Sequence, residues 1–139
     1  LAVVKMACKR CTAADVERLQ HMINLEQSAL DQGDTATALR RSGEFHLQLA
    51  IVADNQPFIN ALRGLISQTS LIITMYSHGG GNTCARDEHS HILAAVKKGD
   101  EHQSEKLMAH HLGHIKDGCN FTQEPQVSSL QGAFAHLGK

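Results

Sequence analysis

Hydrophobic residues recur every three or four positions along most of the chain, which is the period of an amphipathic α-helix. No stretch keeps up the alternation of apolar and polar residues that a half-buried strand shows. The helical pattern is interrupted at Gly33-Asp34, at Asn55-Gln56-Pro57, at Gly79-Gly80-Gly81-Asn82 and at Gly99-Asp100. The sequence therefore predicts an all-α fold, an antiparallel helical bundle of about six helices with short connections.

The interruptions set the expected limits of each helix. Residues 1–7 are apolar and helical in character, and we interpret them as the remainder of a truncated first helix. Thr12 with Asp15 resembles a capping box that opens the next helix. The further helices are expected over residues 35–53, 57–77, 85–98 and 101–116, with a short one around 130–137. The segment 57–77 is the most apolar, so we expect it to be the central and most buried element.

Composition is that of one ordinary globular domain. The chain has 139 residues, of which 42% are hydrophobic and 19% charged, and its net charge is −1. Its longest basic run is a pair such as Lys97-Lys98, so this segment on its own is a poor nucleic-acid binder. We find no membrane span and no signal peptide, and we expect no membrane partner. Cys8 and Cys11 form a CxxC without a second one, which favours reduced thiols and a cytoplasmic location.

Histidine is the unusual component, with ten residues in the chain. The helical period sorts them into surface and core positions. His46, His89 and His111 fall on the apolar faces of three different predicted helices. Their apolar neighbours three, four or seven positions away are Leu49 and Ala50 for His46, Ile92, Leu93 and Val96 for His89, and Leu107 and Ile115 for His111.

Three inward-facing histidines in one small core are a candidate metal site. A buried imidazole needs partners for both nitrogens, and a shared divalent ion satisfies three rings at once. The expected cofactor is a divalent transition metal, Zn or Ni first, although imidazole also suits Cu and Fe. The helical period alone leaves this reading and three separately satisfied core histidines both open.

A second pair, His110 and His114, lies one helical turn apart on a polar row. Such a pair can chelate a metal at a surface. It lacks the Glu of a metalloprotease helix and any obvious third ligand, so the sequence disfavours a site there.

Several short motifs follow one another along the chain: Gly43-Glu44-Phe45-His46, Asn55, Asp87-Glu88-His89, Ile92, Ala95, Gly99-Asp100, Met108 and His111-Leu112. His46 and His89 are 43 positions apart, and His89 and His111 are 22 positions apart. This order and spacing, over residues 12–116, resemble the FCD ligand-binding domain of GntR-type transcription regulators of the FadR-like subfamily, whose metal histidines have the same intervals.

The resemblance implies a dimeric regulator whose N-terminal winged helix-turn-helix binds DNA. Its C-terminal bundle binds an effector, often a small organic acid, beside a metal held by one Asp and three His. On this basis residues 1–139 are an effector-binding and dimerisation domain, and DNA is bound only through an N-terminal domain absent from this chain. The expected partners are a small organic-acid effector and a second copy of the chain, with His46, His89 and His111 as metal ligands.

One position departs from the family pattern. Ser42 stands where the family has its ligand Asp, four residues before His46, and Glu44 points away from the His46 face. A site of three histidines is more positive than the family's site, which should favour an anionic effector. The candidate effector contacts are Ser42, Arg41, Gln68, Tyr76 and Arg86, although Arg41 and Arg86 are equally well read as solvated charges.

Two other functions fit the same residues. A three-histidine metal with an open position can activate water, as in a small hydrolytic metalloenzyme. Against this, Glu88 is adjacent to His89 and, one residue along a helix, is expected to point elsewhere, which leaves no general base. The site can also be purely structural, in a metal-stabilised dimerisation module.

Overall fold

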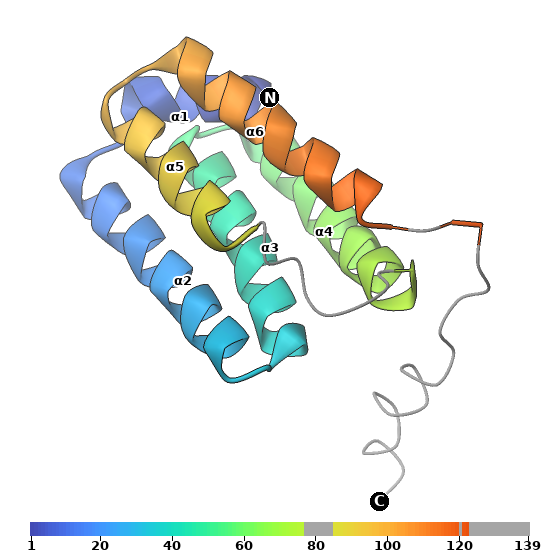
Figure 1. Ribbon diagram of the computed structural model, residues 1–139. Coiled ribbons are helices and arrows are strands. Elements are labelled where there is room, and N and C mark those ends of the chain that lie inside the picture. The colour runs from blue at the N-terminus through green and yellow to red at the C-terminus, as the bar shows by residue number, and fades with distance from the viewer. Residues whose placement is uncertain (77–84, 120, 123–139) are drawn as a thin grey trace, which may run out of the picture.

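The computed structural model describes residues 1–76, 85–119 and 121–122, and within these ranges it confirms the all-α fold (Figure 1). The described residues form six helices close to the expected limits, and the helix expected around residues 130–137 lies outside them. The helices are α1 (Ala2–Arg10), α2 (Ala13–Asp31), α3 (Thr35–Val52), α4 (Gln56–Tyr76), α5 (Ala85–Lys97) and α6 (Glu101–Asp117).

Two antiparallel helix pairs form the body of the bundle. Helix α2 packs along α3, and α5 packs along α6 (Figure 1). The two pairs meet through contacts between α2 and α5, and α1 packs against α3, α5 and α6. At the start of α2, the expected capping box of Thr12 with Asp15 is confirmed, because each residue's side chain bonds the other's backbone N–H.

The same dipeptide makes the corner of both helix pairs. Gly33 and Gly99 adopt φ of 72° and 70°, a left-handed conformation that glycine enters without strain. The amides of Asp34 and Asp100 then donate back to the carbonyls of Ala29 and Ala95, at 2.9 and 3.0 Å. Asp34 and Asp100 also begin the following helices, since their side chains accept the amides of Thr37 and Gln103. Two residues therefore end one helix and start the next.

The hydrophobic core lies where α1, α2, α3, α5 and α6 meet. His89 and His111 are fully buried in it, and the ring of Phe45 lies 4.4 Å from that of His89, centroid to centroid. The buried apolar residues of this core are Val4, Ala7, Leu19, Ile23, Phe45, Leu49, Val52, Ile92, Leu93, Val96 and Met108.

Helix α4 is not the most buried element, and that expectation was wrong. Its only buried residue is Ile59, whereas Leu65 and Leu71 are 54% and 48% exposed. Helix α4 carries many apolar residues, but it packs mainly on α3, so few of them are covered. The two helices approach each other closely at Gly43, where an added Cβ would lie 2.6 Å from Cγ2 of Ile66.

Two expectations on membranes and cysteines can also be compared with the structure. Among the described residues, no helix has both the length and the apolar character that a membrane span requires. Cys8, Cys11 and Cys119 are free thiols, and Sγ of Cys8 lies 3.1 Å from Oγ of Ser104. Cys84 lies outside the described residues.

The left-handed corner gives a stability prediction. We expect Gly99→Ala to lower the free energy of unfolding by about 1–2 kcal/mol, because an L side chain is strained at this φ. The matched control is Gly64→Ala, where an added Cβ meets nothing within 4 Å and the φ is helical. That substitution should raise the free energy of unfolding by about 0.5–1 kcal/mol. Urea unfolding followed by circular dichroism measures both, and equal effects of the two substitutions would contradict the assignment.

Candidate metal centre

Helices α3, α5 and α6 bring His46, His89 and His111 together. Nε2 of His111 lies 3.1 Å from Nε2 of His46 and 3.2 Å from Nε2 of His89. The three candidate ligand atoms all lie within 4.8 Å of one another. Zn–N bonds of 2.0–2.1 Å at tetrahedral angles place ligand nitrogens about 3.3 Å apart. The spacing of the triad therefore fits one shared ion.

A buried carboxylate supports His89 from behind. Glu26 on α2 is only 5% exposed, and its Oε2 accepts a hydrogen bond of 2.6 Å from Nδ1 of His89. The hydroxyl of Ser42 also interacts with Glu26 and acts to lower the pKa of that carboxyl. With its proton on Nδ1, His89 keeps the lone pair of Nε2 directed at the triad.

A second carboxylate supports His111 in the same way. Oε2 of Glu88 on α5 accepts a hydrogen bond of 2.7 Å from Nδ1 of His111. The expectation that Glu88 points away from the site was wrong, because α6 packs on α5 and carries His111 to it. Glu88 contacts the outer nitrogen of the ring, on the side away from the other two histidines, so it supports a ligand instead of facing the open side of the triad.

Because the carboxylates hold the Nδ1 protons of His89 and His111, Nε2 of each neutral ring carries no proton. Nε2 of His89 and Nε2 of His111 both act as acceptors, and they face each other at 3.2 Å. Two unprotonated nitrogens at this distance repel each other unless a proton or a metal ion lies between them. The donor set and its orientation thus fit a divalent metal better than three separately satisfied core histidines.

The protonation states agree with metal binding near neutral pH. Burial, with a smaller contribution from His111, lowers the pKa of His89 to about 3. Burial also holds the pKa of His46 well below its ordinary value, with His89 and His111 adding to the effect. Both rings are therefore neutral at pH 7, as a metal ligand must be.

The pKa values of the two carboxylates shift in opposite directions. Burial raises the pKa of Glu26 to about 7, although His111 and the hydrogen bond with Ser42 partly offset it. Burial also acts to raise the pKa of Glu88, but hydrogen bonds from His111 and His114 outweigh it and leave this pKa below its ordinary value. Glu88 is therefore the firmly ionised member of the two.

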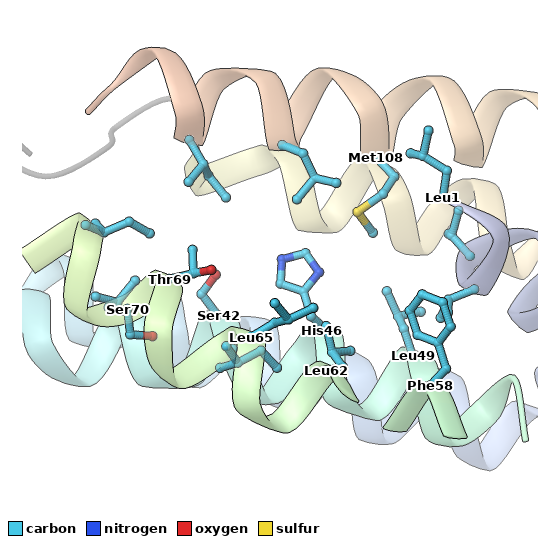
Figure 2. Close-up of a pocket in the computed structure, with 18 residues that line it drawn as sticks. Leu1, Ser42, His46, Leu49, Phe58, Leu62, Leu65, Thr69, Ser70 and Met108 are labelled. Carbon is cyan, nitrogen blue, oxygen red and sulfur yellow. The ribbon is translucent and has the colours of Figure 1, made fainter. Parts of the chain in front are cut away.

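The triad adjoins a cavity of about 300 Å³ between α3, α4 and α6, which Leu1 and α1 close at one end (Figure 2). The ring of His46 projects into it, so one metal-facing histidine is also part of its wall. Leu, Ile, Val, Phe and Met side chains line most of it, and the other polar groups are the hydroxyls of Ser42, Thr69 and Ser70. No charged side chain is among the described residues that line this cavity.

Of the five expected effector contacts, the structure brings one to the cavity. Ser42 lines it beside His46, whereas Arg41, Gln68 and Tyr76 are not among the lining residues. Arg41 is held in an ion pair of 2.8 Å with Glu44, Gln68 is exposed, and Tyr76 packs its ring against Phe121. The side chain of Arg86 lies outside what the structure describes. A role in effector binding stays a prediction for all five.

Glu26 was not among the residues predicted from the sequence, and Glu88 was considered there only as a general base. Glu26 lies three positions after Ile23 and seven after Leu19, both fully buried, so it is a charge on the apolar face of its helix. Glu88 lies four positions before Ile92, which is also buried. A carboxylate placed on an apolar helical face was the signal available in the sequence.

Comparison with known proteins gives one match. A family model described as the FCD domain matches residues 1–114, a range that contains the triad and both supporting carboxylates. A search of curated proteins found no match.

The triad predicts that metal binding depends on His89 and not on its neighbour. We expect His89→Ala to lose the tightly bound zinc of the triad, because one of its three ligands is lost. His91→Ala is the matched control, since His91 lies on the same helix and is exposed. Metal content after dialysis is measured by mass spectrometry, and circular dichroism checks the fold. Equal zinc contents in His89→Ala and His91→Ala would exclude the shared site.

The buried carboxylate gives a separate prediction. We expect Glu26→Gln to weaken zinc binding by about 10–100-fold, the usual effect of altering a group that orients a metal ligand. Glu17→Gln on the exposed side of α2 removes the same charge without touching His89 and should leave the affinity unchanged. Competition with a zinc chelator measures the affinities. An unchanged affinity in Glu26→Gln would show that Glu26 does not support the ligand.

Proposed function

This chain belongs to the FCD domain family, and on that premise we propose that it is the metal-dependent effector-binding domain of a GntR-type transcription regulator. The observation that carries the proposal is that His46 belongs both to the triad and to the wall of an apolar cavity. A ligand in the cavity would thus lie next to the metal centre. Family membership favours a regulatory ligand-binding domain over a catalytic one.

The residues of such a site would have different roles. His46, His89 and His111 would hold a divalent ion such as Zn²⁺ or Ni²⁺, while Glu26 and Glu88 orient two of the rings. When bound, the ion would supply a Lewis-acidic position for one carboxylate oxygen of an effector. Ser42 adds no charge, so the effector's own carboxylate takes the place that the family's Asp holds elsewhere.

The cavity wall supports a particular class of organic acid. Additional carboxylates of a di- or tricarboxylic acid would be buried without a cationic partner among the described lining residues, which is costly. An apolar body, by contrast, matches Leu62, Leu65, Ile66 and Met108. The volume of about 300 Å³ is at the small end for ligand sites. We therefore propose a small monocarboxylic acid with an apolar body.

Helix α4 is the element through which the effector would act. It forms one wall of the cavity and packs mainly on α3, so it can shift without disrupting the core. Four large apolar residues on it are exposed and support a homodimer contact: Phe58, Leu65, Leu71 and Ile72. An effector that binds one position of α4 better than another would shift the dimer, and through it the DNA-binding domains of the full regulator.

The test compares hexanoate, citrate and 1-hexanol as additives in a thermal-unfolding assay of the zinc-loaded and metal-free protein. Hexanoate should raise the melting temperature only when zinc is present, because its carboxylate needs the ion and its chain needs the cavity. Citrate lacks the apolar body and hexanol lacks the carboxylate, so both should act weakly. Equal stabilisation by hexanoate with and without zinc would contradict the proposal.

Ser42 offers a sharper version of the same test. In Ser42→Asp the new carboxylate should tighten zinc binding and weaken hexanoate binding, each by about tenfold, since it competes for the open position. Ser42→Asn has a similar size without the charge and serves as the control. Isothermal titration with zinc and then with hexanoate separates the two effects. Hexanoate binding as tight in Ser42→Asp as in Ser42→Asn would contradict a role of this position in effector binding.

A further inference from the structure

We propose that Glu88, His110 and His114 form a second metal site, on the outer face of the α5–α6 pair, and that Glu88 couples it to the triad. The three side chains offer one carboxylate oxygen and two imidazole nitrogens within 4.8 Å of one another. We call them the outer site. It shares no metal-facing nitrogen with the triad and does not require that the triad hold an ion.

The geometry of the outer site begins with α6. His110 and His114 are one helical turn apart, and their ring centroids are 4.0 Å apart. Oε1 of Glu88, from α5, lies 2.5 Å from Nδ1 of His114 and 3.6 Å from Nδ1 of His110. Two histidines four positions apart on a helix are an established chelating arrangement, and the structure supplies the third ligand that the sequence lacked.

Hydrogen bonding alone explains only part of this cluster. The bond from His114 to Glu88 is complete without a metal, but 3.6 Å is too long for a hydrogen bond from His110. An ion bound by Oε1 and both rings would use all three side chains. Two imidazoles and a carboxylate are a donor set that suits Zn²⁺, Ni²⁺ and Cu²⁺.

Exposure distinguishes the outer site from the triad. The side chains of His110 and His114 are 63% and 40% exposed, whereas that of Glu88 is 13% exposed and held in place by His111. Water therefore completes the coordination of an ion there. We expect the outer site to be the weaker and more rapidly exchanging of the two.

The coupling follows from how Glu88 uses its two oxygens. Oε2 accepts the hydrogen bond from Nδ1 of His111, and Oε1 faces His110 and His114. An ion on Oε1 draws electron density from the carboxylate that makes His111 a better ligand. Each site should therefore bind its ion more weakly when the other is filled, and the effect must be reciprocal.

The test is a titration of the metal-free chain with zinc chloride. Wild-type protein should bind two ions with different affinities, and His114→Ala should lose the weaker one and keep the tighter one. His102→Ala, on an exposed position of the same helix, is the matched control and should keep both. Circular dichroism verifies that each variant folds. A second ion bound equally by wild type and by His114→Ala would overturn the outer site.

A further variant separates this proposal from the triad. His46→Ala removes a triad ligand from α3 and leaves α5 and α6 unchanged. His46→Ala should lose the tighter ion. Its outer site should bind zinc at least about fivefold more tightly than the outer site of wild type, in which the triad is filled. Equal outer-site affinities in the two proteins would overturn the coupling. If His114→Ala loses an ion although the triad binds none in wild type, the outer site stands and the proposed metal-dependent function fails.

Discussion

The hydrogen bonds from His89 to Glu26 and from His111 to Glu88 determine where the protons of the site lie. Each carboxylate takes the outer N–H of one ring and so directs the opposite nitrogen inward as an acceptor. The rest of the arrangement depends on this constraint. Helices α2 and α5 must pack closely enough to place Glu26 behind His89, and α5 and α6 must do the same for Glu88 and His111. The core around Phe45 keeps those packing distances fixed.

The sequence predicted the features that depend on a single helix or a single corner. The inward facing of His46, His89 and His111 follows from the helical period, and the Gly-Asp corners are fixed by the backbone of two residues. The roles of Glu26 and Glu88 depend on which helix packs next to which, and no period within one helix contains that information. The prediction that α4 is the most buried helix was wrong for a related reason. Its hydrophobicity shows how much surface it can bury, but burial is decided by how many neighbours surround it.

Ser42 connects the metal centre and the cavity. Its side chain interacts with Glu26, which supports His89, and it also lines the cavity into which His46 projects. A carboxylate at this position would place a third negative charge beside Glu26 and Glu88. With serine there, no carboxylate is added at this position, and the proposed metal site would have only Glu26 and Glu88 as acidic neighbours. An anionic effector, as proposed above, would then meet less negative charge.

The Gly-Asp corners have a consequence for the order in which the protein assembles. Because each corner is so short, α2 and α3 are neighbours in sequence, and so are α5 and α6. Pairing neighbouring helices closes only short loops, which favours its early formation in folding. The triad draws His46 from the first pair and His89 and His111 from the second, so it is complete only after the pairs dock. Glu88, His110 and His114 all belong to the second pair. A newly formed α5–α6 hairpin would therefore already contain the residues of the proposed outer site before the triad is complete.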